Sequence, residues 1–271
     1  MTRFVWHQRQ KLWKVAAIIG VVVGGYTCLA YLILPALWRH YEHNPALATV
    51  PLVTRTAAGI PGDPINVALV GTDPEVVAAL TAAGWRPAQP ISLPSGLGIV
   101  ESVLLQRPDP TAPVSNLYLW GRHQDLAFEQ EAGSSARERH HVRFWRTDAL
   151  GDGTRPLWIG AATFDRSVGL SHRTGQITHH IAPDLDAERD KLIADLAAEG
   201  RLTIIYRVSG IGPTLSGRNG GGDRYFTDGD ITVGVLTVGG GVATRRVEQL
   251  PTPPAVKVKN HLWSWLRPLL D

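Results

Sequence analysis

The chain has very little cysteine, and this scarcity excludes several kinds of site. Among its 271 residues only Cys28 is a cysteine, so neither an intrachain disulfide nor a zinc site built from cysteines can form. An excess of one charge is missing as well, because 27 Lys and Arg residues face 24 Asp and Glu residues. No stripe of cations and aromatic residues runs along the sequence, so we expect no nucleic acid among the partners.

The sequence motifs of several well-known catalytic centres are also missing. It contains no HExxH or HxxxH metal spacing, no GxSxG nucleophile turn, no P-loop and no EF-hand loop. We therefore find no catalytic signature and lean towards a protein that is not an enzyme and needs no cofactor.

One long run of uncharged residues is present, at positions 15–38. A helix of this length, at ~1.5 Å per residue, spans roughly 36 Å and is long enough for a hydrocarbon core of about 30 Å. A cleaved signal peptide needs a shorter apolar core and a cleavage site of small residues, and neither is evident. We expect an uncleaved transmembrane helix, which makes the lipid bilayer a partner.

The charges beside this run predict its orientation. Four cations precede it, namely Arg3, Arg9, Lys11 and Lys14, and such cations favour the cytoplasmic side. We expect a single-pass protein of the bacterial inner membrane with its N-terminus in the cytoplasm and its globular part outside. The predicted organisation is a basic tail (1–14), a transmembrane helix (15–38), a linker rich in Pro, Ala and Thr (39–64), a globular domain (65–245) and a C-terminal tail (246–271).

The periodicity of the globular part predicts an α+β fold, with mostly antiparallel sheet and two principal helices. The first helix follows Thr72 or Asp73 and stops at Gly84, and the second covers about 185–199 and stops at Gly200. Strands are expected at 65–70, 101–106, 116–120, 125–130, 139–146, 157–165, 177–181, 202–208 and 231–238.

The stretch HHIAPDLDAERDKL, residues 179–192, combines two histidines with several acids. Successive side chains of a strand point to opposite faces. His179 should therefore be at least partly buried beside Ile177 and Ile181, whereas replacing His180 should be nearly silent. A metal site would need three or four ligands that converge. The candidates are His140, Asp165, His172 and His179, and we expect no metal there.

A structural interpretation accounts for the stretch as a junction between a strand and a helix. Asp184 and Asp186 lie where carboxylates cap a helix N-terminus. Arg189 lies beside the apolar stripe of the helix, so it needs an acidic partner, for which Asp165 is a candidate. His179, Asp186 and Arg189 should then form a structural polar network.

Two segments nearer the C-terminus have alternative interpretations. The glycine-rich loop 216–230 is a mobile connection, or it binds an anion through backbone N–H groups with help from Arg218 and Arg224. The segment 257–271 mixes tryptophan and leucine with cations. It is either an amphipathic segment in the membrane interface or a terminal helix docked on the domain.

Five segments of the globular part carry a recognisable pattern, and they are LYLWGRHQDLAFEQ (117–130), RERHHVRFWR (137–146), WIGAATFD (158–165), THHIAPDLDAERD (178–190) and GRNGGGDRYFTDGD (217–230). Together they resemble the LssY-like C-terminal domain family, over about residues 65–240. The resemblance implies a module that follows membrane segments and a domain similar to lipid phosphatases. Here only one span is expected, and Leu97 follows Pro94-Ser95-Gly96 where such phosphatases carry histidine, so phosphatase activity is not carried over.

Three functions remain open at this point. The first is a membrane-anchored binding or assembly module of the cell envelope, with envelope proteins or lipids as partners. The second is a metal-dependent or acid–base hydrolase of an envelope or lipid substrate, with His140, Asp165, His172, His179 and Asp184 as candidate catalytic residues. The third, an accessory protein that handles lipids, rests on the family resemblance alone.

Overall fold

The computed structural model describes residues 2–36, 47, 50–88, 116–132, 138–173, 175, 177–208 and 216–269. The strand expected at 101–106 and the stretch Pro94–Leu97 lie outside these ranges. The chain divides into two compact units, Met1–His43 and Asn44–Asp271, and each is described by itself.

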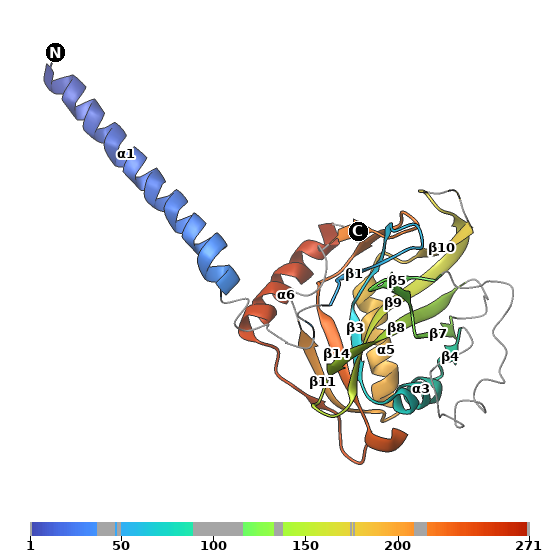
Figure 1. Ribbon diagram of the computed structural model, residues 1–271. Coiled ribbons are helices and arrows are strands. Elements are labelled where there is room, and N and C mark those ends of the chain that lie inside the picture. The colour runs from blue at the N-terminus through green and yellow to red at the C-terminus, as the bar shows by residue number, and fades with distance from the viewer. Residues whose placement is uncertain are drawn as a thin grey trace. The chain divides into compact units, whose positions relative to one another are not determined.

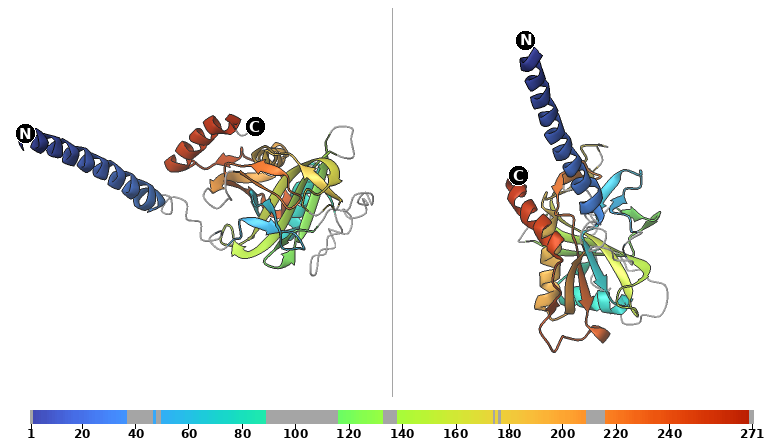
Figure 2. Two further views of the ribbon diagram at one scale, coloured as in Figure 1. Left: turned by 90° about the horizontal axis from the view of Figure 1, so that it is seen from above. Right: turned by 90° about the vertical axis from the view of Figure 1, so that its left-hand side faces the viewer.

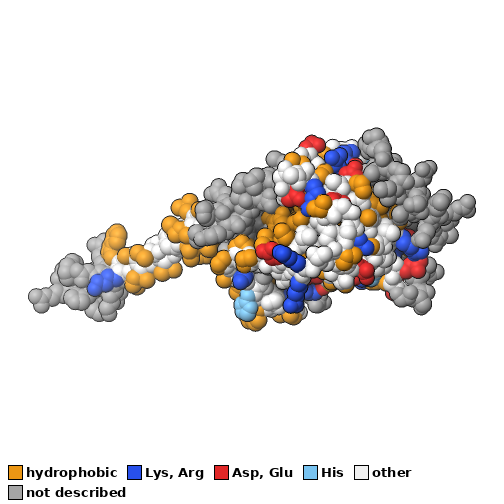
Figure 3. Space-filling view, turned by 90° about the horizontal axis from the view of Figure 1, so that it is seen from below, with side chains coloured by type: hydrophobic (Ala, Val, Ile, Leu, Met, Phe, Trp, Pro, Cys, Tyr) orange, Lys and Arg blue, Asp and Glu red, His pale blue; other side chains and the backbone are white. Residues whose placement is uncertain are grey.

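The first unit is a single long helix. Helix α1 (Thr2–Cys28) continues into a π-helical turn, η1 (Leu29–Ile33), and the backbone is helical as far as Ala36, the last described residue of this stretch. The wider turn lies just before Pro35, whose ring would clash with the carbonyl four residues earlier in a regular α-helix. The apolar side chains of the long helix are exposed (Figure 3), and Leu12–Ala36 is long and apolar enough to cross a membrane. A signal sequence would meet the same criterion.

A nine-stranded sheet forms the centre of the second unit (Figure 1). Its strands follow the order β15-β11-β14-β3-β9-β8-β7-β4, with β10 paired to β9. The neighbours β14–β3 and β11–β15 are parallel and the other pairs are antiparallel. The strands are β3 (Val67–Val70), β4 (Arg86–Pro87), β7 (Leu126–Glu131), β8 (Arg139–Leu150), β9 (Pro156–Leu170), β10 (Ile177–Ile181), β11 (Leu202–Val208), β14 (Ile231–Leu236) and β15 (Glu248–Gln249).

Two helices cover one face of this sheet, as the sequence predicts. Helix α3 (Asp73–Ala82) has Thr72 as its N-cap, and α5 (Leu185–Ala198) has Asp184, whose carboxylate accepts the N–H of Ala187 at 3.2 Å. A glycine with positive φ follows each helix, and these are Gly84 (81°) and Gly200 (61°). The predicted α+β fold with antiparallel sheet and these two helices is confirmed.

A small second sheet covers the opposite face. It consists of β1 (Val53–Arg55), β2 (Pro61–Pro64), β5 (Tyr118–Leu119) and β6 (Arg122–His123). In the right-hand view of Figure 2, α5 and the small sheet lie on opposite sides of the long sheet. Separate apolar clusters fill the two interlayer spaces, one around Leu80, Phe144 and Leu196 and the other around Trp145 and Ile159. Strands β1 and β2 fall in the stretch 39–64 that was expected to be a linker, so that expectation is wrong for both strands.

The remaining elements close the unit. Strands β12 (Ser216–Arg218) and β13 (Arg224–Phe226) form a hairpin within the loop 216–230. A 3-10 turn, η2 (Val238–Gly240), follows β14.

Helix α6 (Pro254–Leu266), followed by the turn η3 (Arg267–Leu269), is docked on the globular unit. Its Val256 and Trp263 are buried, and Lys259 and Asn260 bind the carboxylate of Asp230. Arg267 forms an ion pair with the capping Asp184. The other side of the segment exposes apolar residues, namely Val258, Leu262, Trp265, Leu266 and Leu269. The segment is therefore a helix docked on the domain, and its contact with the membrane interface stays a prediction.

Candidate functional site

One face of the long sheet carries buried charges instead of apolar side chains. Alternation along β8 places Arg139, His141 and Arg143 on one face and His140, Val142 and Phe144 on the other. In the register of β8 with β9, Arg139 lies opposite Asp165 and His141 lies opposite Thr163. The face of β8 and β9 turned away from α3 and α5 is therefore polar over these two pairs and at Arg143, which lies opposite Ala161.

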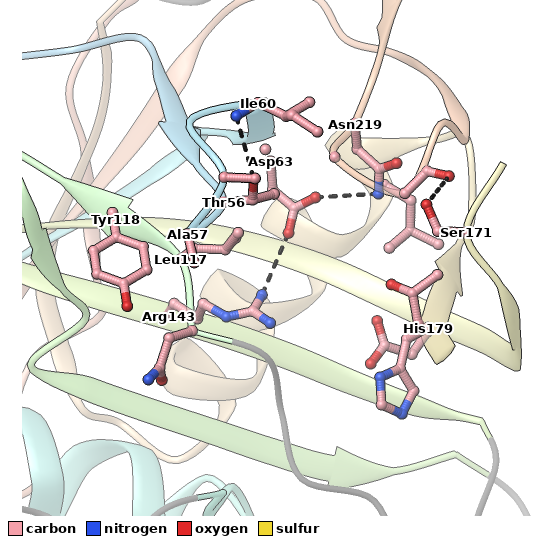
Figure 4. A pocket seen from close by; sticks show the side chains of 18 residues that line it. Thr56, Ala57, Ile60, Asp63, Leu117, Tyr118, Arg143, Ser171, His179 and Asn219 are labelled. Carbon is pink, nitrogen blue, oxygen red and sulfur yellow. Dashed lines mark hydrogen bonds and ion pairs between the residues drawn. The ribbon is translucent and has the colours of Figure 1, made fainter. Parts of the chain in front are cut away.

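A pocket of about 500 Å³ lies over this polar face. Arg143 of β8 and Asp165 of β9 line it together with Thr178 and His179 of β10. The remaining walls come from the β1–β2 hairpin, β5 with the two residues before it, the turn after β9 and the turn of the β12–β13 hairpin. They include Thr56, Ile60, Asp63, Asn116, Leu117, Tyr118, Ser171, Asn219, Gly220 and Gly221. Figure 4 shows Tyr118 and Leu117 at one end of the pocket and His179 and Ser171 at the other.

Ion pairs and hydrogen bonds hold the charged side chains of the pocket in place. Asp63 accepts from Arg143 at 3.3 Å and from the side-chain amide of Asn219 at 3.4 Å (Figure 4). Beside them, Arg139 binds Glu129 at 2.9 Å and its Nε lies 3.6 Å from Asp165 Oδ2. A second nitrogen of Arg139 lies 2.7 Å from Nε2 of His179. Since the guanidinium can only donate, Nε2 accepts, and the neutral imidazole of His179 carries its proton on Nδ1.

Burial shifts the protonation equilibria of the pocket. It raises the pKa of Asp165 to about 7, because desolvation outweighs the opposing charges of Arg143 and Arg139. It also raises the pKa of Asp63, against the charge of Arg143. Burial and then the charges of Arg139 and Arg143 lower the pKa of His179 to about 4. At neutral pH, His179 is therefore uncharged, and Asp165 keeps a proton far more readily than an exposed aspartate.

Two buried polar side chains lie next to the pocket's charges without a hydrogen-bond partner among the described residues. They are His141, at both ring nitrogens, and Thr163, at its hydroxyl. Burial, followed by the charges of Arg143, Arg139 and His179, lowers the pKa of His141 well below its usual value, so its ring is neutral. Each unsatisfied buried group costs about 1–3 kcal/mol, and unpaired groups of this kind are rare in native structures.

The comparison with protein families matches this fold to one family. The family model described as LssY C-terminus matches residues 47–231. The chain belongs to the LssY C-terminus family. The match begins ahead of β1 and ends at the start of β14, so it contains every residue that lines the pocket. No curated protein and no solved structure matches the chain.

In this member of the LssY C-terminus family, the four candidate metal ligands do not converge. His140 lies on the helix-covered face of the sheet, where its Nδ1 is 2.9 Å from Glu188 of α5. Asp165 and His179 lie on the opposite face beside Arg139. His172 follows β9, and its Nε2 is 3.8 Å from Asp223. Strand alternation separates His140 from the other three, because its partner across β8 and β9 is Phe164 and not Asp165.

Arg189 is paired with acids, as its position predicts, but Asp165, the candidate named from the sequence, is not among them. Arg189 is 1% exposed and binds both carboxylate oxygens of Asp228, at 2.7 and 3.1 Å. It also binds Asp190 at 2.8 Å and Asp186 at 3.3 Å. Although burial acts to lower it, the pKa of Arg189 is raised by Asp228 and Asp186. Asp165, the partner expected from sequence, lies beside Arg139 on another face of the sheet.

The candidate acids of the junction have separate structural roles. Asp184 caps α5, whereas Asp186 accepts from the hydroxyl of Thr227 at 2.7 Å and from the N–H of Asp228 at 2.8 Å. Burial raises the pKa of Asp186, against the charge of Arg189. Both aspartates therefore fix the N-terminal end of α5 and lie outside the residues that line the pocket.

The structure gives no support to the expectation that replacing His180 is nearly silent. Its side chain is mostly buried, and its Nδ1 lies 2.8 Å from Asp223 Oδ1. The turn of the β12–β13 hairpin covers this side of β10 through Asp223. Arg218 and Arg224, the candidate ligand-binding residues, are cross-strand partners in this hairpin, and neither lines the pocket. The hairpin contributes to the pocket through Asn219, Gly220 and Gly221 instead.

Proposed function

We propose that the protein is a membrane-anchored envelope module that binds a neutral, hydroxyl-rich group, such as a saccharide or a saccharide-like lipid headgroup. The observation that carries the proposal is the pocket of about 500 Å³ over the polar sheet face, a volume typical of small-molecule sites. Hydroxyl, amide and carboxyl groups dominate its wall, through Thr56, Tyr118, Ser171, Thr178, Asn116, Asn219, Asp63 and Asp165.

The charges of the pocket favour a neutral ligand. Arg143 is already paired with Asp63, and His179 is uncharged at neutral pH. With a pKa of about 7, Asp165 can accept or donate hydrogen bonds without a full negative charge. An anionic ligand would meet two carboxyl groups, whereas hydroxyl groups can bond to both kinds of partner. Ile60, Leu117 and the ring of Tyr118 supply the apolar surface for a sugar ring.

The N-terminal helix supports the anchoring part of the proposal. Leu12–Ala36 spans 25 residues and is exposed along its length, and cations precede it in the sequence. We propose that it holds the chain in the bacterial inner membrane with the globular unit outside the cytoplasm. A reporter enzyme that works only outside the cytoplasm, fused after residue 60, should be active. If this fusion is inactive while a reporter that works only in the cytoplasm is active at the same position, the proposed orientation is refuted.

Binding can be tested with the full chain in a detergent that has no sugar headgroup. Isothermal titration with a panel of free mono- and disaccharides would test the free source, and vesicles with a neutral glycolipid would test the lipid source. Thr178→Val removes one pocket hydroxyl while keeping the side-chain shape, and should weaken binding several-fold. Thr244→Val, at an exposed position outside the pocket, is the matched control. Preferential binding of phosphate or carboxylate ligands, or equal binding by both variants, would refute the proposal.

A hydrolase is the second candidate, and one observation favours it. Asp165 has a pKa of about 7 in the same pocket as Asp63, and an acid of this kind can donate a proton near neutral pH. His179 is less suited to act as a base, because its Nε2 lone pair already faces Arg139. Release of a fluorescent alcohol from neutral glycosides by the wild type, lost in Asp165→Asn with saccharide binding retained, would support hydrolysis over binding alone.

A further inference from the structure

We propose that His172, His180 and Asp223 form a binding site for one divalent transition metal of the zinc class. The three residues come from separate segments, which are the turn after β9, the strand β10 and the turn between β12 and β13. One ligand atom from each lies within 4.8 Å of the others. This site is independent of the proposed saccharide pocket, because none of its three ligands lines that pocket.

The donor set and its spacing fit such an ion. Two imidazoles and a carboxylate are ligands that zinc takes at about 2.0–2.2 Å. In a tetrahedral site with bonds of that length, ligand atoms lie about 3.4 Å apart. Asp223 Oδ1 is 2.8 Å from His180 Nδ1 and 3.8 Å from His172 Nε2. Each of these separations therefore needs to change by only about half an ångström when the metal enters.

Two glycines leave the space that the imidazoles occupy. A Cβ on Gly169 would lie 2.6 Å from Nε2 of His180, and a Cβ on Gly222 would lie 2.8 Å from Cβ of His172. Gly222 also has a φ of 93°, in the region that favours glycine. Side chains at these two positions would displace the rings, so the backbone around the site is fitted to both histidines.

Contacts behind the ligands fix their orientation. The second oxygen of Asp223 accepts the N–H of Ile181 at 3.3 Å, and the N–H of Asp223 donates to the side chain of Asn219 at 2.9 Å. The N–H of His172 donates to the carbonyl of Gly221 at 2.9 Å. Such outer contacts hold metal ligands in place and commonly change affinity 10- to 100-fold when lost.

The exposure of the three side chains gives the ion a way in. Asp223 is 3% exposed, His180 is 15% exposed and His172 is 65% exposed. The carboxylate thus lies at the base of the site and His172 at its open side, where a water molecule can complete the coordination. The simpler alternative is a hydrogen bond between His180 and Asp223 with His172 lying nearby, and this alternative predicts no metal binding.

The test uses the full chain without a polyhistidine tag, purified in detergent and freed of metal by dialysis against a chelator. Zinc binding is measured by competition with a chromogenic chelator, and cobalt is added as a spectroscopic probe of tetrahedral coordination. His172→Ala is the decisive variant, because an exposed side chain can be removed with the fold retained, as circular dichroism would verify. Asp223→Asn removes the buried ligand. His123→Ala, an exposed histidine outside the site, is the matched control.

We expect one zinc ion per chain, binding at least tenfold weaker in His172→Ala and in Asp223→Asn, and unchanged binding in His123→Ala. Zinc should also raise the melting temperature of the wild type but not that of His172→Ala. The absence of stoichiometric zinc, or equal affinity in the wild type and His172→Ala, would overturn the proposal and leave only the hydrogen bond between His180 and Asp223.

Discussion

Replacing Arg189 by alanine should destabilise the globular unit strongly. Removing one partner of a buried ion pair typically costs about 3–5 kcal/mol, because the other charge stays buried without compensation. Here the carboxylates of Asp228 and Asp186 would lose their shared partner. Arg207 remains 3.5 Å from Asp228 and compensates in part. We therefore expect a loss near the lower limit, about 3 kcal/mol.

The loss should also shrink as the pH falls. In the wild type, burial acts to raise the pKa of Asp228, but Arg189 and other donors lower it overall. In the wild type, the ionised Asp228 therefore stabilises the fold above the ordinary pKa of an aspartate, and this stabilisation is lost as the pH falls through the lowered pKa of the folded state. Without Arg189, burial should raise the pKa of Asp228 in the folded state. The variant then regains stability when Asp228 takes up a proton, so the difference from the wild type should be smaller at pH 5 than at pH 7.

Urea unfolding of the full chain in detergent, followed by tryptophan fluorescence, would measure both effects, since Trp85, Trp145 and Trp158 are fully buried. Arg245→Ala, at an exposed position, is the control and should change the free energy of unfolding by less than about 0.5 kcal/mol. A double-mutant cycle with Asp228→Asn should give a coupling energy above about 1 kcal/mol. A loss no larger than that of Arg245→Ala, or one that grows as the pH falls, would show that Arg189 is not the partner that stabilises these acids.

Three further predictions concern the pocket, the metal site and α6. Burial raises the pKa of Asp165 to about 7, so the contribution of its protonated form to stability is complete below the unfolded pKa and is lost as the pH rises from there to about 7. Over this range the free energy of unfolding of Asp165→Asn should rise relative to the wild type by at most about 1.4 kcal/mol per pH unit. The same difference between the two proteins at pH 5 and at pH 8 would contradict this. Gly222 has a φ of 93°, so Gly222→Ala should lower the free energy of unfolding by about 1–3 kcal/mol. Gly221→Ala should lower it less, because its added Cβ meets only ordinary contacts. Equal melting temperatures of the two variants would refute the strain. In vesicles of the Cys28→Ser protein, a spin label at position 265 should be reached by lipid-dissolved oxygen and shielded from a water-soluble quencher, whereas a label at position 244 should not. Equal accessibility of the two labels would argue against contact between α6 and the bilayer.

Local signals in the sequence were sufficient to predict the helices α3 and α5. Thr72 and Asp184 cap their helices by short-range hydrogen bonds, and Gly84 and Gly200 follow them with positive φ. These signals act over a few residues, so they can be read without knowing the rest of the fold. The strands β1 and β2 were missed because a short segment rich in Pro and Ala shows no alternation, and only pairing with β5 makes it part of a sheet.

The candidate site depends on contacts between distant parts of the chain, which the sequence does not reveal. Alternation separates His179 from His180 correctly, but it cannot show that the β12–β13 turn covers the second face. In the same way, the position of Arg189 predicts that it needs an acid, yet Asp228 lies 39 residues away. Asp63 was assigned to a linker, although it pairs with Arg143 across 80 residues. Charged residues at alternate positions of β8, Arg139 and Arg143, were the one available signal for the polar face.

The docking of α6 bears on the order in which this unit can fold during synthesis. The acids around the start of α5 and the start of β14 include Asp184 and Asp230, and α6 and the turn after it supply the partners Lys259 and Arg267. Because α6 follows every strand of the long sheet in the chain, a nascent chain that already contains the whole sheet still lacks these two cations. Arg189 and Arg207 already neutralise part of this corner, but Asp184 and Asp230 lack these two partners until α6 arrives. Closure of this corner should be a late step, completed only after α6 has been synthesised and, under the proposed topology, has crossed the membrane.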